Sequence, residues 1–174
     1  MVKSILVVVL FLFSQAAIAF SYTVEITEPE LQEKILKIMP LVKNKFFVTV
    51  TLSEPKVDLQ SENNNIAIFC RVEVTAPGGI KGTGKVKVSG SLKYEQKKYE
   101  FFLKDPVLES LEIDKVPDKF IPKIKNMSQQ IITKVLAKRP VYKLKDNNLK
   151  HKLAKSLLQS ITVKDEILYV VLGF

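Results

Sequence analysis

The feature that most constrains the fold is a hydrophobic pattern with a period of two, which recurs through the middle of the chain. Apolar and polar side chains alternate in residues 46–53, 66–75 and 85–94, and a fourth stretch, 99–113, continues after one interruption by an Asp-Pro pair. Such alternation is typical of β-strands with one buried and one solvated face. We therefore expect an antiparallel meander of about four strands, with one apolar face and one wet face.

Lysine is the commonest residue between residues 81 and 106, which raises the question of a negatively charged partner. The whole chain has 27 basic and 18 acidic residues, a formal net charge of +9. In residues 85–94 the lysines alternate with Val86, Val88 and Leu92, so they fall on the wet face of a strand. A solvated sheet face is the leading interpretation, and a weak contact with an anionic membrane surface is the alternative. No nucleic-acid partner is expected, because the cations do not interleave with aromatic side chains available for stacking.

Two other stretches have helical periodicity. A capping box formed by Thr27 and Glu30 predicts a helix over residues 28–39. A longer helix is predicted from Asp118 to about residue 138, and its broad apolar face suits the concave side of a twisted sheet. The main stripe on this face consists of Phe120, Ile124, Met127, Ile131 and Val135.

Three elements are expected in the tail. They are a strand over residues 140–144, a short helix that ends near residue 160, and a strand over residues 167–172. The last is a nearly continuous apolar run, so we expect it to be paired inside a sheet.

The N-terminus has the pattern of a secretory signal peptide. A positively charged start precedes an unbroken apolar run over residues 5–13, and an Ala-Ile-Ala motif follows. The run is shorter than the ~20 residues that span a bilayer. We expect a cleaved signal peptide over residues 1–19 and a single periplasmic α+β domain over residues 20–174. The only cysteine, Cys70, excludes an internal disulfide and shares the apolar face of its strand, which predicts an inert core thiol.

The order of these elements and three local strings resemble the YceB-like family of small bacterial envelope lipoproteins. The strings are YTVEITEPELQEKI, RPVYKLKD and KLAKSLLQSITVKDEILYVVL. The resemblance implies an α+β fold in which a curved antiparallel β-sheet wraps around a long amphipathic helix, with additional shorter helices, similar to half of a tubular lipid-binding module. It brings no catalytic residues and no established ligand. Because no lipid-attachment cysteine follows the signal, we expect a soluble periplasmic protein rather than an anchored one.

We expect a non-enzymatic protein that binds or carries a lipid-like or other apolar ligand. Its site would be a groove between the longer helix and the apolar face of the sheet. The predicted groove residues are Val86, Val88, Leu92, Tyr99, Phe101, Phe120, Ile124, Met127, Ile131 and Val135. The alternative is an envelope protein–protein interaction or assembly factor with a closed core. The sequence predicts no cofactor and identifies no protein partner.

No group of residues predicts catalysis or metal binding. The single histidine, His151, lies in a lysine-rich segment and is expected to be a solvated surface side chain. The string GGIKGTG lacks the ending of a phosphate-binding loop, so we interpret it as a hairpin connection. Two acidic pairs, Asp114 with Asp118 and Asp165 with Glu166, fall beside the ends of expected elements and are interpreted as caps or turns.

Overall fold

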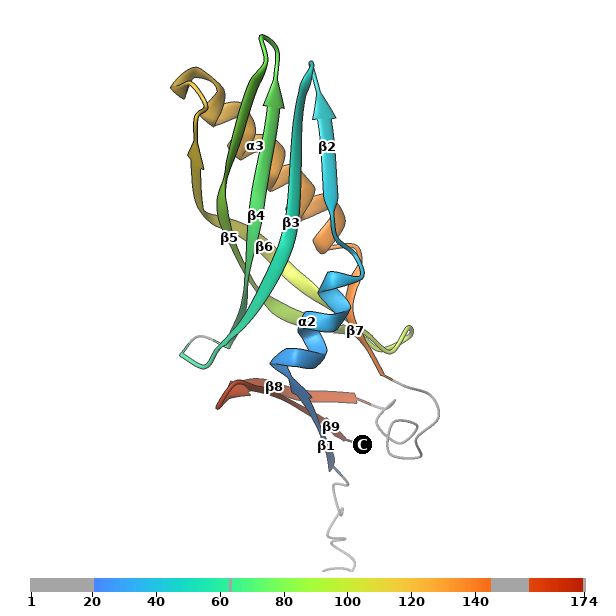
Figure 1. The fold of residues 1–174 in the computed structure, drawn as a ribbon. Coiled ribbons are helices and arrows are strands. Elements are labelled where there is room, and N and C mark those ends of the chain that lie inside the picture. The colour runs from blue at the N-terminus through green and yellow to red at the C-terminus, as the bar shows by residue number, and fades with distance from the viewer. Residues whose placement is uncertain (1–20, 63, 145–156, 174) are drawn as a thin grey trace, which may run out of the picture.

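The computed structural model describes residues 21–62, 64–144 and 157–173, in which nine strands form two antiparallel sheets (Figure 1). The larger sheet contains, in spatial order, β2 (Leu41–Lys45), β3 (Val48–Gln60), β4 (Asn65–Ala76), β5 (Ile80–Glu95), β6 (Glu100–Asp114) and β7 (Pro140–Lys143). The smaller contains β1 (Ser21–Thr27), β9 (Ile167–Gly173) and β8 (Leu157–Lys164). The consecutive order of the larger sheet confirms the predicted meander, which extends to six strands.

The first and last strands of the described chain are neighbours in the smaller sheet. Val24 of β1 lies opposite Val170 of β9, and β8 pairs with the other edge of β9. The final apolar strand is therefore paired on both sides, as predicted. Residues 157–160, however, belong to strand β8 and not to the short helix expected there, because β8 completes the pairing of β9. The rest of that predicted helix lies outside the described residues.

The predicted fold class is wrong, because the protein is mostly β rather than α+β. Strands hold 62% of the described residues and helices hold 20%. The larger sheet curls without wrapping a long amphipathic helix: the helix packed against it, α3 (Ile121–Ile131), has only 11 residues. A short 3₁₀ turn, η1 (Asp118–Phe120), precedes α3, and a π-helical turn, η2 (Ile132–Leu136), follows it. The first helix, α2 (Glu28–Leu36), also ends before the predicted Met39.

Strands β3 and β6 are longer than expected because a β-bulge in each strand accommodates a proline, Pro55 in β3 and Pro106 in β6. In β6, the pairing with β5 shifts around Asp105, which has a positive φ of 45°. Gln129 of α3 satisfies the displaced backbone: its side-chain amide donates to the Pro106 carbonyl at 3.0 Å, and its carbonyl oxygen accepts from the Leu108 N–H at 2.9 Å. A bulge bends its strand and increases the local twist. The curl of the sheet and the position of α3 are therefore fixed at the same place.

Helix α2 is also held to β3 by a glutamine side chain that bonds to the backbone of a bulge. Pro55 follows Glu54, which also has a positive φ, and the β3–β4 pairing shifts here. The Gln32 side chain donates to the Pro55 carbonyl and accepts from the Val57 N–H at 2.8 Å. The start of α2 is as predicted, because the Thr27 N–H donates to the Glu30 carboxylate at 3.1 Å.

The lysines of β5 occupy the solvated face of the larger sheet, as predicted. Val86 and Val88 are buried, whereas Lys85 is exposed and Lys87 is half-buried on the opposite face. The apolar face packs against α3, so the core of the larger sheet lies on its α3 side.

Candidate functional site

The ten residues of the predicted groove share one apolar cluster, in which α3 packs against the larger sheet. All ten belong to one apolar cluster or pack against it. Six have an exposed fraction of 2% or less: Val86, Val88, Phe101, Ile124, Met127 and Ile131. The other four are partly buried: Leu92, Tyr99, Phe120 and Val135. The sequence therefore identified the helix–sheet interface, and ligand binding at that interface stays a prediction.

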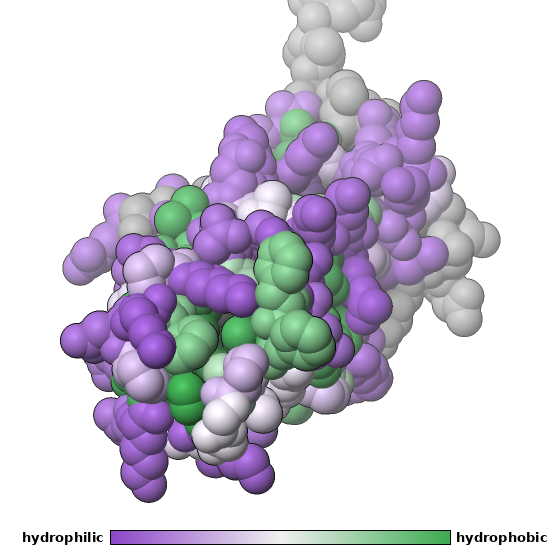
Figure 2. All heavy atoms as spheres, turned by 90° about the horizontal axis from the view of Figure 1, so that it is seen from above, coloured by the Kyte–Doolittle hydropathy of each residue, from purple (hydrophilic) through white to green (hydrophobic). Residues whose placement is uncertain are grey.

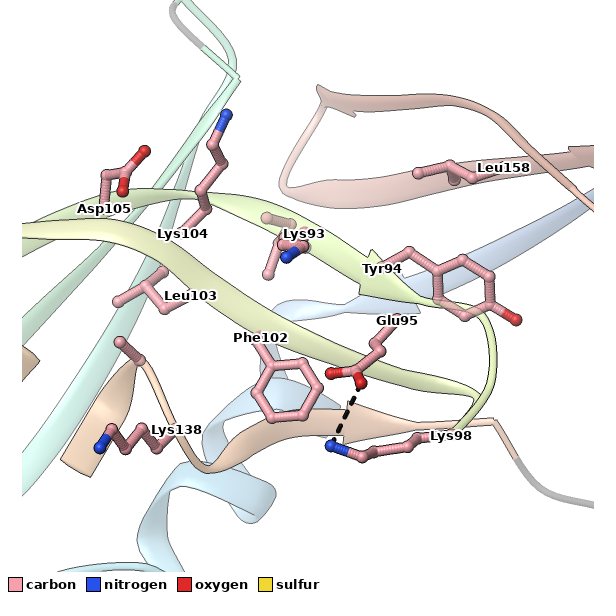
Figure 3. A pocket seen from close by; sticks show the side chains of 12 residues that line it. Lys93, Tyr94, Glu95, Lys98, Phe102, Leu103, Lys104, Asp105, Lys138 and Leu158 are labelled. Carbon is pink, nitrogen blue, oxygen red and sulfur yellow. Dashed lines mark ion pairs between the residues drawn. The ribbon is translucent and has the colours of Figure 1, made fainter. Parts of the chain in front are cut away.

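A separate open hollow of about 820 Å³ lies at the end of the β5–β6 hairpin (Figure 3). It is bounded by β5, β6, the segment after η2, and β8 of the smaller sheet, so both sheets contribute to it. We call this cavity the hollow. It is lined by Leu92, Lys93, Tyr94, Glu95, Lys98, Phe102, Leu103, Lys104, Asp105, Ala137, Lys138 and Leu158.

Half of the lining residues are apolar or aromatic. Phe102 and Leu103 come from β6, and Leu158 comes from β8. The Tyr94 ring lies 4.8 Å, centroid to centroid, from the ring of Phe101, which is completely buried. Burial is also the main cause that raises the pKa of Tyr94. The hollow is thus built directly on the rigid core.

The other half of the lining is charged, with cations in excess. Four lysines and two carboxylates give a formal charge of +2, from Lys93, Lys98, Lys104 and Lys138 against Glu95 and Asp105. Only Lys98 and Glu95 form an ion pair in this view, at 3.2 Å (Figure 3). The Lys98 ammonium also lies 5.7 Å from the centroid of the Phe102 ring. Apolar surface beside an excess of cations suits a ligand with an apolar part and an acidic part.

The sequence reading missed the hollow, although a local signal was present. Residues 101–103 are three consecutive apolar residues, which interrupt the alternation. Phe101 and Leu103 face the core, so Phe102 places an aromatic ring on the opposite face of β6. An apolar side chain at that position indicates that the wet face has a neighbour there. Leu158 of β8 lines the same hollow as Phe102, and no local pattern predicts the position of β8.

The residues considered for chemistry have structural roles where they are described. Cys70 is buried, and burial raises the pKa of its thiol to about 12, which confirms the inert core thiol. His151 lies outside the described residues. Within the described ranges, no cluster of three or more histidine, cysteine, aspartate or glutamate side chains is arranged to hold a metal ion.

The remaining predicted turns are also confirmed. The string GGIKGTG forms the β4–β5 connection and the start of β5, with positive φ angles at Gly78 and Gly79. Asp165 and Glu166 form the turn between β8 and β9.

Among the helices that the structure describes, none has both the length and the apolar character needed to cross a membrane.

Comparison with known protein families identifies the family of this chain. The sequence model of a family described as "Protein of unknown function (DUF1439)" matches residues 26–166, which is most of the chain. No curated protein matches the sequence. The resemblance to YceB-like lipoproteins stays a prediction, because no named relative supports it.

Proposed function

We propose that this chain, which belongs to the DUF1439 family, is a non-enzymatic protein that binds a lipid-like amphiphile in the periplasm. The observation that carries the proposal is the hollow of about 820 Å³, with its apolar lining and excess of lysines. Its volume lies within the ~300–1,000 Å³ of typical small-molecule sites. The periplasmic location rests on the signal-like pattern of residues 1–19.

The lining suggests how such a ligand would lie. An acyl chain would contact Phe102 and Leu158, and its acidic group would lie near Lys104 and Lys138. Each methylene removed from water contributes about 0.8 kcal/mol, so a medium-length chain could offset the ordering cost of binding. The lysines would select an anionic head group over a neutral one.

The hollow is a better location for the ligand than the predicted groove. A ligand between α3 and the sheet would have to displace side chains such as Ile124 and Ile131, which are packed at 2% exposure or less. Separating well-packed apolar surfaces removes their contacts and is costly. The hollow is already open, so binding there leaves the core intact.

The closed helix–sheet interface also favours a second candidate function. A protein whose core is filled can act as an envelope interaction or assembly factor, through its surface alone. Native mass spectrometry separates the two functions. An amphiphile-sized mass that accompanies the exported protein and leaves on denaturation supports ligand binding. A protein that carries no ligand and does not bind added oleate supports the interaction factor.

A matched pair of variants tests the location of the site. Leu158→Glu places a carboxylate in the hollow, and Val107→Glu makes the same change on β6 outside it. The exposed fractions are 36% for Leu158 and 54% for Val107, so both proteins should fold. We expect Leu158→Glu to weaken oleate binding by about tenfold or more, because it removes apolar contact and adds repulsion. Equal oleate affinity in the two folded variants would contradict the site.

A further inference from the structure

A second surface lies at the opposite end of the larger sheet from the hollow. The β2–β3 turn lies beyond the last residue pair of its strands, Lys45 with Val48, and the β4–β5 turn lies beyond Ala76 with Ile80. The chain also leaves β6 for α3 at this end. These turns form the top of the molecule in Figure 1. Seen from above, this end shows a group of hydrophobic side chains surrounded by hydrophilic ones (Figure 2).

The β2–β3 turn exposes two adjacent phenylalanines. The exposed fraction is 72% for Phe46 and 92% for Phe47. Their φ angles are 48° and 63°, so both adopt the left-handed conformation that a two-residue hairpin turn requires. Asn-Gly is favoured in such turns, and bulky side chains are uncommon there. The phenylalanines gain little burial in this protein, so folding does not explain their presence, and exposed apolar pairs of this kind mark contact surfaces.

Lysines from two elements lie near aromatic rings at this end of the sheet. The ammonium groups of Lys45 and Lys123 lie 5.5 Å and 5.3 Å from the centroid of the Phe46 ring. Lys119 lies 5.4 Å from the centroid of the Phe120 ring, one turn earlier on the same helical segment as Lys123. None of these three lysines takes part in the ion pairs found among the described residues. Their charges are therefore available to an external anion.

We propose that this tip, defined by Phe46, Phe47, Lys45, Lys119 and Lys123, docks on the surface of an anionic lipid bilayer. The phenylalanines would enter the boundary between head groups and acyl chains, and the lysines would contact lipid phosphates. Aromatic and basic side chains in this arrangement are characteristic of proteins that lie on membrane interfaces. The excess of cations favours an anionic lipid surface over a protein partner of unspecified charge. This inference concerns a different surface from the hollow and does not depend on the proposed ligand.

A tryptophan reporter tests insertion at the tip itself. The chain has no tryptophan, so Phe47→Trp introduces a single fluorophore, and Glu166→Trp places one at the β8–β9 turn as a control. We expect vesicles of phosphatidylcholine with phosphatidylglycerol to shift the Phe47→Trp emission to the blue, and brominated lipid to quench it. The control should not respond. An unchanged Phe47→Trp spectrum, or an equal response from Glu166→Trp, would overturn the proposal.

A second experiment separates docking from folding. Phe46→Asn with Phe47→Gly supplies the favoured turn sequence, so the variant should remain folded while its affinity for anionic vesicles falls by about a hundredfold. Asp165→Asn with Glu166→Gly is the matched control and should bind like the original chain. All variants keep the same N-terminus, so residues 5–13 contribute equally to each. Undiminished vesicle binding by the Asn-Gly variant at the tip would overturn the proposal.

Two controls assign the partner. Lys45→Glu, Lys119→Glu and Lys123→Glu together should remove the preference for phosphatidylglycerol over phosphatidylcholine alone, and added salt should do the same for the original chain. Retained preference in the triple variant would count against the tip. Light scattering without lipid should show no dimer that depends on the tip. A dimer that dissociates in the Phe46→Asn/Phe47→Gly variant would mean that the tip binds a second copy of the chain and not a membrane.

Discussion

The β2–β3 and β8–β9 hairpins have the same turn and different side chains. Phe46 and Phe47 connect one pair of strands, with φ angles of 48° and 63°, and Asp165 and Glu166 connect the other, with φ angles of 50° and 59°. Both loops have two residues, and neither contains glycine. Because polar residues serve at one turn, the backbone geometry does not require phenylalanine at the other. The aromatic pair is therefore a property of the surface at that end of the sheet.

Moving the aromatic pair from one turn to the other should have the largest effect. Phe46→Asp with Phe47→Glu should lower the affinity for anionic vesicles by more than about a hundredfold, because it removes two apolar contacts and adds repulsion. Adding Asp165→Phe and Glu166→Phe to this variant should restore only part of the affinity. Lys119 and Lys123 remain at the other end, and the surroundings of the transplanted turn are mixed in charge, because Glu166 lines a pocket with Glu28 and Asp58 as well as two lysines. Vesicle flotation measures each step, and full recovery would show that the lysines are unnecessary.

The two turns should respond alike when stability is measured. Placing Asn-Gly at either turn should raise the free energy of unfolding by roughly 1–2 kcal/mol, because it relieves left-handed strain in larger side chains. Urea unfolding of both double variants measures this change. A loss of stability at positions 46 and 47 alone would mean that the phenylalanines pack usefully on their neighbours. That result would give the aromatic pair a structural role that the acidic pair lacks.

The sequence predicts the strands well but misses the β2–β3 turn, and the two results have one cause. Val48, Val50 and Leu52 alternate with polar residues, and all three are buried as expected. The alternation of apolar and polar residues continues back to Phe46, so the sequence predicts the aromatic pair to be the first residues of a strand. A period of two reports which face a side chain occupies, but it does not report where a chain reverses. Without glycine or asparagine, nothing local marked residues 46–47 as a turn.

The errors in the fold have a related origin. The sequence predicts an interruption at Pro106, yet a bulge carries β6 past it with the help of Gln129, and β3 passes Pro55 in the same way with the help of Gln32. These contacts join residues more than twenty positions apart, so the sequence pattern cannot reveal them. The hollow was missed for the same reason, since its lining joins Phe102 of the larger sheet with Leu158 of the smaller one.

A single lysine should have a smaller effect than either turn. Lys123→Ala removes one cation beside Phe46 and should lower the affinity for anionic vesicles by about fivefold at low salt. Lys164→Ala, next to Asp165 at the other turn, is the matched control and should leave affinity unchanged. Titration with phosphatidylglycerol vesicles measures both. Equal losses in the two variants would indicate a response to net charge and not to the tip.

The smallest effect is expected at a lysine–phenylalanine contact that belongs to neither turn. On the wet face of the sheet, the Lys87 ammonium lies 5.8 Å from the centroid of the Phe69 ring, and it pairs with the Glu109 carboxylate at 2.7 Å. The hydrogen bond from Lys87, followed by one from Ser89, lowers the pKa of Glu109. A depressed carboxyl pKa stabilises the fold above the ordinary value of about 4.3, and this contribution is lost as the pH falls through the lowered pKa.

Glu109→Gln should therefore reduce stability at neutral pH by no more than about 0.5 kcal/mol, because the pair is partly exposed and screened by solvent. The difference between the two proteins should vanish in acid, where Glu109 is protonated in both the folded and unfolded chains. Urea unfolding at neutral pH and well below pH ~4 measures it. A difference that persists in acid would assign Glu109 a role beyond its charge. Vesicle binding at neutral pH should not change, since Lys87 and Phe69 lie on the sheet face and not at the tip. A gain in binding would show that Lys87 and Phe69 form a second membrane-binding surface, which the ion pair with Glu109 keeps from docking.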